Sequence, residues 1–200
     1  MINHTYTNLH GKDPEMIPLP ENAGAYLWYL STIPYWSSQF GGMFRRAAGK
    51  LTKAECKFVP RSEIKAVVLE SRLMILGYLF IIVLVFAFDW WAPLLYWWIP
   101  MMLGEPVMRF IRMTEHAGRP TIADITRNTR TNIVSSLWRF LAWNMNYHAA
   151  HHYAASVPFY RLRELHERIK DRVYVEPNGY INAHKDILQR VRAQSWSARS

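Results

Sequence analysis

The stretch Trp143-Asn144-Met145-Asn146-Tyr147-His148-Ala149-Ala150-His151-His152 places three imidazoles within five residues. In a helix, His148, His151 and His152 stand at positions i, i+3 and i+4 and therefore share one face. Three neutral imidazoles on one face suit a metal ion far better than a packed core. The alternative is a solvated patch of surface histidines. The density of the motif favours a metal site.

The composition narrows the class of protein. Of the 200 residues, 50% are hydrophobic and 14% are aromatic, which is rich for a soluble protein. The single cysteine, Cys56, excludes an intramolecular disulfide framework and any all-thiolate zinc or iron–sulfur site. The formal net charge is +9, but the basic residues flank apolar segments and no nucleic-acid-binding motif is present. We therefore expect no nucleic-acid partner.

Two uncharged segments, 73–88 and 90–103, are separated only by Asp89. Each is slightly shorter than the roughly 20 residues of a bilayer-spanning helix, but the tryptophans after Asp89 extend the first and add an aromatic belt. A charged residue at the membrane centre costs roughly 2.5–3.5 kcal/mol, so Asp89 is expected at a turn. These features predict a transmembrane hairpin at about 72–104. The alternative is a buried hairpin in a soluble core.

Both flanks of the predicted hairpin are basic. The upstream residues are Arg45, Arg46, Lys50, Lys53, Lys57, Arg61 and Lys65, and the downstream ones are Arg109, Arg112, Arg119, Arg127 and Arg130. By the positive-inside rule, both flanks are expected on the cytoplasmic side, together with the segments that carry the histidines. The sequence thus predicts an all-α, helical integral membrane protein with one transmembrane hairpin and a cytoplasmic helical cap.

The remaining segments give coarser expectations. Residues 25–44, which contain Pro34, fit a helix lying on the membrane surface or, equally, an amphipathic core helix. Residues 128–146 have helical periodicity, and one apolar stripe is formed by Ile133, Leu137, Phe140 and Leu141. A further helix is expected to begin at Leu162 and run to Lys170. From Arg172 the composition is polar, with a turn at Pro177-Asn178-Gly179 and a mobile end at 195–200.

The order of motifs around the histidines resembles a known family. The pattern H-x-x-H-H at 148–152 is followed by Ser156-Val157-Pro158-Phe159-Tyr160 and by L-x-x-L-H at 162–166. This order is similar to the last histidine box of the membrane fatty acid desaturases, which form a wider family with membrane hydroxylases and ketolases. The end of the second box resembles the opening of this chain, His4-Thr5-Tyr6-Thr7-Asn8 followed by Gly11-Lys12-Asp13-Pro14-Glu15. An additional ligand segment of the family resembles Thr114-Glu115-His116. The resemblance places a desaturase-like domain at 1–170 and a polar tail at 171–200.

The resemblance implies a non-haem di-iron centre on the cytoplasmic side. Imidazole suits iron, and open positions on a redox-active pair can activate O2. The implied direct ligands are His116, His148, His151 and His152; Asn144, on the same helical face as His148, would be a weak or water-mediated ligand, and His4 the last histidine of the second box. His166 is expected beside the ligands as a hydrogen-bonded residue or at the surface. His10 and His184 are expected to be exposed to solvent.

The implied activity is the O2-dependent oxidation of an acyl chain to introduce a double bond. A related hydroxylase or ketolase would use the same ligands, so the histidines do not choose between these products. The implied substrate is a membrane lipid or an acyl carrier. Electrons would come from an external donor of ferredoxin or cytochrome type, since the chain has no flavin, haem or dinucleotide motif.

The sequence also departs from the family pattern. The first box, of H-x-x-x-H type, would lie upstream of residue 1, and Asn3 stands where the first histidine of a pair is expected. Ala150 occupies a position where an acidic residue is common, which weakens the outer support of the imidazoles. The expectation is that these residues are the C-terminal part of a longer enzyme, or alternatively an inactive truncated fragment.

Overall fold

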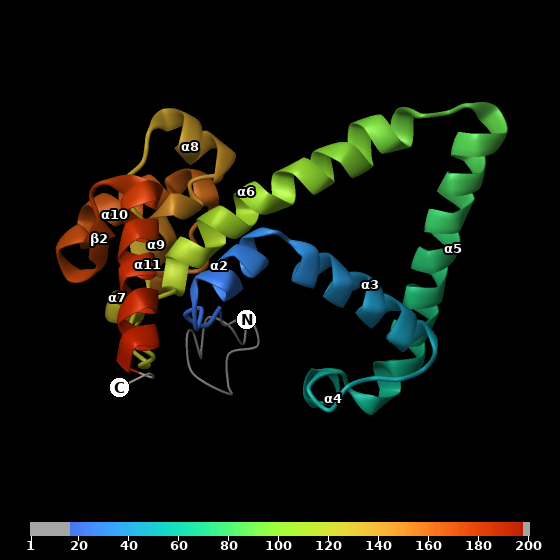
Figure 1. The fold of residues 1–200 in the computed structure, drawn as a ribbon, viewed down its shortest axis with the longest axis horizontal. Helices are drawn as coiled ribbons and strands as arrows, with labels where there is room; N and C mark the ends of the chain where they lie inside the picture. The colour runs from blue at the N-terminus through green and yellow to red at the C-terminus, as the bar shows by residue number, and fades with distance from the viewer. Residues whose placement is uncertain (1–16, 198–200) are drawn as a thin grey trace. The chain divides into compact units, whose positions relative to one another are not determined.

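The computed structural model describes residues 17–197, which are mostly helical (Figure 1). The chain forms two compact units. The first contains the described residues of Met1–Leu30 and Val107–Ser200, and the second contains Ser31–Pro106.

The second unit is built around one long apolar helix. Its elements are α3 (Ile33–Ala47), α4 (Glu55–Phe58), η1 (Arg61–Glu63), α5 (Ile64–Phe88) and η2 (Leu94–Trp98). Among the described residues, one helical segment, Arg61–Phe88, is long and apolar enough to cross a membrane, and 11% of its most apolar part is buried in the structure. Its side chains are therefore available to lipid. Helix α3 begins after Thr32, and Pro34 lies in its first turn, where a missing N–H costs nothing.

Helix α5 ends at Phe88, and the next residue, Asp89, adopts a left-handed conformation with φ of 50°. The chain therefore turns at the predicted residue. The predicted second arm contains the π-helix η2 and the start of α6 (Ile99–His116), with Pro106 inside the latter. Within this unit, Tyr78 of α5 lies against Trp97 and Trp98 of η2, at ring-centroid distances of 5.8 and 5.7 Å. A second membrane crossing and its orientation stay predictions.

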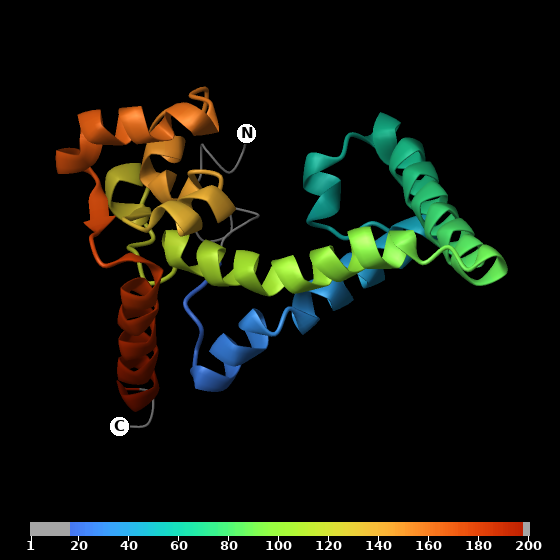
Figure 2. The ribbon, with the colours of Figure 1, turned by 90° about the horizontal axis from the view of Figure 1, so that it is seen from above.

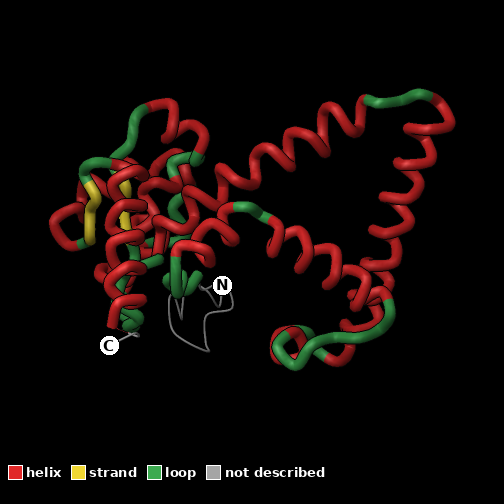
Figure 3. The backbone as a smooth tube through the Cα atoms, viewed as in Figure 1, coloured by secondary structure: helices red, strands yellow, loops and turns green. Residues whose placement is uncertain are grey.

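The first unit consists of helices and a two-stranded sheet (Figure 3). In addition to the end of α6, its elements are α2 (Ala23–Leu30), α7 (Ile125–Asn128), β1 (Arg130–Asn132), α8 (Ser136–Leu141), η3 (Met145–Tyr147), α9 (His148–Tyr153), η4 (Phe159–Arg161), α10 (Leu162–Ile169), η5 (Lys170–Arg172), β2 (Tyr174–Glu176) and α11 (Gly179–Ser197). Strands β1 and β2 run parallel, with Thr131 paired to Val175. Figure 2 shows β2 between α10 and α11.

The predicted helix over 128–146 is wrong. The residues 128–132 are all fully buried and polar, and three of them form β1. The strand residues pair with β2, more than 40 positions further along the chain, and this pairing satisfies their backbone groups. Local periodicity therefore does not indicate the strand. Helix α8 accounts for part of the expected apolar stripe, but Leu137 and Phe140 are 65% and 78% exposed. That stripe faces away from the interior.

The region expected as a polar tail contains β2 and α11. The predicted turn is present at Pro177 and Asn178, and α11 then contributes Ile187 and Val191 to a core cluster with Tyr26, Met113 and Ala117. His184, expected at the surface, is buried at 4% exposure. That prediction is wrong because the ring is fully hydrogen-bonded inside: its Nε2–H donates to the Phe110 carbonyl at 2.9 Å, and its Nδ1 accepts from the Tyr26 hydroxyl at 3.0 Å.

Candidate metal centre

The histidines of the motif lie on the helix α9, so the condition under which their spacing places them on one face is met. Successive residues of an α-helix are rotated by about 100°, so His152 lies about 40° to one side of His148 and His151 about 60° to the other. The two neighbours therefore flank His148. A further ligand that approaches from one flank meets His152 and leaves His151 aside.

That further residue is His116, at the last position of α6. Three nitrogens converge, because His148 Nε2 lies 3.1 Å from His116 Nε2 and 3.1 Å from His152 Nε2. All three ligand atoms lie within 4.8 Å of one another. Nitrogens 3.1 Å apart are compatible with two ligands of one ion at the usual nitrogen–metal distance of about 2.1 Å. We call His116, His148 and His152 the three-histidine cluster.

The backbone sets the tautomer of His116. Its Nδ1 lies 3.1 Å from the carbonyl oxygen of Asn128, which can only accept, so Nδ1 carries the hydrogen and donates it. The Nε2 lone pair is then left facing the cluster. A histidine held by a carbonyl at one nitrogen is the arrangement that metal-ligating imidazoles commonly use.

His148 has a comparable neighbour on its other side. Its Nδ1 is buried, makes no hydrogen bond among the described residues and lies 3.5 Å from Glu115 Oε1. Burial lowers the pKa of His148 well below its ordinary value, and the neighbouring His116 and His152 lower it further. The imidazole is therefore neutral at physiological pH. A neutral ring beside a carboxylate fits a metal ligand whose Nδ1–H points to that carboxylate.

A buried arginine supports the end of α6 that carries His116. Arg130 is fully buried, and one of its guanidinium nitrogens donates to the Thr114 carbonyl at 2.7 Å. Its other terminal nitrogen donates to Asp186 at 3.0 Å. The helix C-terminus carries partial negative charge and unpaired carbonyls, both of which a guanidinium satisfies. Gly118 follows with φ of 75°, the left-handed conformation that ends a helix.

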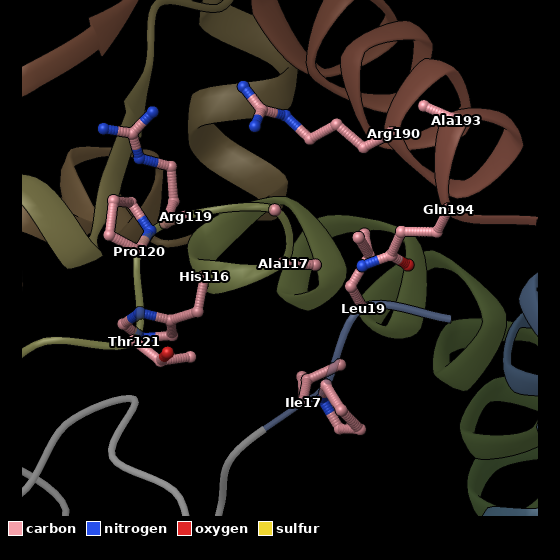
Figure 4. Close-up of a pocket in the computed structure, with 12 residues that line it drawn as sticks. Ile17, Leu19, His116, Ala117, Arg119, Pro120, Thr121, Arg190, Ala193 and Gln194 are labelled. Atoms are coloured by element: carbon pink, nitrogen blue, oxygen red, sulfur yellow. The ribbon is translucent and has the colours of Figure 1, made fainter. Parts of the chain in front are cut away.

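A pocket opens beside His116 (Figure 4). It measures about 700 Å³ and includes Ala117, Arg119, Arg190 and Ile17 in its lining. In Figure 4, Arg119 and Arg190 lie on the side opposite Ile17. The pocket therefore borders one cluster residue, His116, and has two arginines in its lining.

The structure brings together some of the predicted site residues and not others. His116, His148 and His152 form the cluster, whereas His151 contacts the rings of His148 and His152 without joining it. Asn144 has φ of 59° and precedes η3, so the expectation that it shares a helical face with His148 is wrong. His4 and His10 lie outside the described residues. The ligand roles of His4, Asn144 and His151 stay predictions.

His166 is buried at 3% exposure, with its ring centroid 5.0 Å from that of Tyr147. A surface position for this residue is therefore excluded. Glu115 was expected only as part of the segment that carries His116, Arg130 only as a basic residue flanking the hairpin, and Asn128 in no role at the site. The polar, β-branched run Asn128-Thr129-Arg130-Thr131-Asn132 was an available indication, because threonine favours strands over helices.

The comparison with known families agrees with this geometry. The family described as fatty acid desaturase matches residues 1–182, which include the whole three-histidine cluster. The chain belongs to the fatty acid desaturase family. No curated protein and no solved structure matches it. Members of this family are typically membrane-bound, and α5 gives the chain a helix apolar enough for that environment.

Proposed function

We propose that this desaturase-family chain takes part in the O2-dependent oxidation of a fatty acyl chain to introduce a double bond. The observation that carries the proposal is the convergence of three Nε2 atoms where α6 meets α9. It supports an oxidoreductase because the cluster lies within the residues that match the family.

The donor set fits a first-row transition metal. Three imidazoles, one of them with its tautomer fixed by a carbonyl, suit iron. We propose His116, His148 and His152 as ligands of one iron, and His4, Asn144 and His151 as the residues that contribute to a second. When bound, a pair of reduced irons supplies the activation of O2.

The residues of the chain prepare this site before a metal arrives. The Asn128 carbonyl holds the proton of His116 on Nδ1, and burial keeps His148 uncharged. Glu115 is close enough to draw the His148 proton to Nδ1 after a shift of a few tenths of an ångström from 3.5 Å. Both ligand nitrogens then present lone pairs to the same point.

We propose a membrane lipid or an acyl carrier as the substrate and an external ferredoxin or cytochrome as the electron donor. The net charge of +9 supports the donor proposal, because positive surfaces attract acidic partners. The same basic residues support a cytoplasmic position for the first unit.

A single-turnover experiment tests the proposal without a protein donor. The full chain, loaded with iron in lipid vesicles, is reduced anaerobically with dithionite and then exposed to O2, and the acyl chains are analysed by mass spectrometry. Desaturation removes two hydrogens from adjacent carbons, while O2 and two electrons from the reductant yield water. With the wild-type chain we expect a product acyl chain lighter by two hydrogens. With His152→Ala we expect no such product. Oxygenated acyl chains would assign a hydroxylase instead, and unchanged chains would overturn the proposed activity.

A further inference from the structure

We infer that the first unit has its own membrane-contacting face, formed by α8 and the segments beside it. Its exposed residues, here called the α8 face, are Ile133, Leu137, Phe140, Leu141, Trp143, Phe159 and Tyr160, which are between 39% and 78% exposed. The proposed partner is the boundary between headgroups and acyl chains of an anionic bilayer. The inference does not depend on the metal or on turnover.

Helix α8 is apolar on two opposite sides. One side packs inward: Ala142 is buried, and Trp138 lies against Phe110 and Tyr180 at ring-centroid distances of 6.1 and 5.6 Å. The other side carries Leu137, Phe140 and Leu141 into the open. A helix at a protein–water boundary normally carries polar residues on its outer side, whereas the polar residues of α8, Ser136 and Arg139, line the groove described below. We therefore infer that the outer side of α8 contacts an apolar environment other than the interior of the protein.

The chain after α8 extends the same face. Trp143 and Asn144 both adopt left-handed conformations, with φ of 51° and 59°, which are uncommon for residues other than glycine. In this conformation Trp143 is 66% exposed and its ring lies 5.1 Å from that of Phe159, centroid to centroid. A groove of about 490 Å³ lies here, lined by Ser136, Arg139, Phe140, Trp143, Asn144 and Phe159. Phe140, Trp143 and Phe159 thus meet at one groove, with Tyr160 against Phe159.

The arginines in this part of the chain favour an anionic partner. Residues 125–163 contain five arginines and no aspartate or glutamate. Arg130 is buried, whereas Arg127, Arg161 and Arg163 are exposed, Arg161 lying 3.7 Å from Glu164, and Arg139 lines the groove. Tryptophan, tyrosine and phenylalanine beside arginines are typical of segments that lie in the membrane interface. Anionic headgroups complement this charge. A bilayer is also expected close to this chain, because α5 is long and apolar enough to cross one.

The single cysteine allows a direct test of depth. A Cys56→Ser background receives one new cysteine by Phe140→Cys, a nitroxide label is attached, and the full chain is reconstituted in phosphatidylcholine–phosphatidylglycerol vesicles. Power-saturation EPR then compares collisions with apolar O2 and with a water-soluble nickel chelate. The matched control is Glu167→Cys on α10, an exposed position in the same unit. A second label at Leu137→Cys guards against a local effect of one substitution.

We expect labels at positions 140 and 137 to collide preferentially with O2, with nickel collisions at least fivefold fewer than at position 167. Equal nickel access at the three positions would overturn the inference. Protection that comes with spin–spin broadening, and that disappears when labelled chain is diluted with unlabelled chain, would assign the face to a second copy and would also overturn it.

Discussion

Replacing Arg130 with methionine tests whether the buried guanidinium holds the end of α6 in place. The side chain is fully buried and donates to the Thr114 carbonyl and to Asp186. Methionine fills a similar volume but leaves the carbonyl without this donor. Removing one partner of a buried ion pair usually costs about 3–5 kcal/mol. Asp186 keeps a 3.0 Å contact with Arg190 and is 27% exposed, so the lower end of that range applies.

We therefore expect Arg130→Met to lower the free energy of unfolding by about 3 kcal/mol, which corresponds to a fall in Tm on the order of 10 °C for a unit of this size. The assay is thermal unfolding followed by circular dichroism in detergent micelles. The matched control is Arg163→Met on α10, where the arginine is exposed and little change in Tm is expected. A Tm for Arg130→Met within about 2 °C of the control would show that the buried guanidinium does not stabilise the end of α6.

Three further predictions concern the same unit. Burial lowers the pKa of His184 to about 4, so as pH falls this residue is protonated in the unfolded chain, near pH 6.5, before it is protonated in the folded chain. The folded state should therefore lose up to about 3 kcal/mol of stability through His184 as pH falls from 6.5 to 4. Chemical unfolding should show a shallower loss of stability in this window for His184→Gln, and the same loss in the variant and the wild type would exclude this role of His184. Gly118→Ala should cost about 1–2 kcal/mol because φ is 75°, whereas Gly41→Ala, a helical position with open space at Cβ, should cost none. Glu115→Gln should weaken iron binding about tenfold in an anaerobic titration while the exposed control Glu167→Gln leaves it unchanged; equal affinities would remove Glu115 from the site.

The spacing of the histidines was enough to predict that His148 and His152 share one face wherever the stretch is helical, and α9 meets that condition. The reason is physical: positions i and i+4 meet on a helix whatever surrounds it. The turn at Asp89 and the start of α10 at Leu162 were also confirmed, because charge and proline interrupt apolar helices. The association of His116 with α9 came from the family resemblance alone, since nothing in the residues between them indicates the contact.

The errors share one cause, which is long-range pairing. Strand β1 exists because β2 satisfies its backbone, and His184 is buried because Tyr26 and Phe110 satisfy its ring. Neither partner can be recognised from neighbouring residues. The apolar stripe of α8 was recognised from the sequence but its exposure was not, because periodicity gives the faces of a helix and not what covers each face.

The most direct test of the account is the iron content of the chain with and without one cluster histidine. The full chain, His152→Ala and His166→Ala are loaded anaerobically with iron(II) in detergent, freed of excess metal by gel filtration and measured for bound iron. Both substitutions remove a buried histidine of the first unit, but only His152 lies in the three-histidine cluster. We predict that the wild type and His166→Ala retain iron and that His152→Ala loses it. Equal iron in His152→Ala and the wild type would contradict the assignment of the cluster as the metal site.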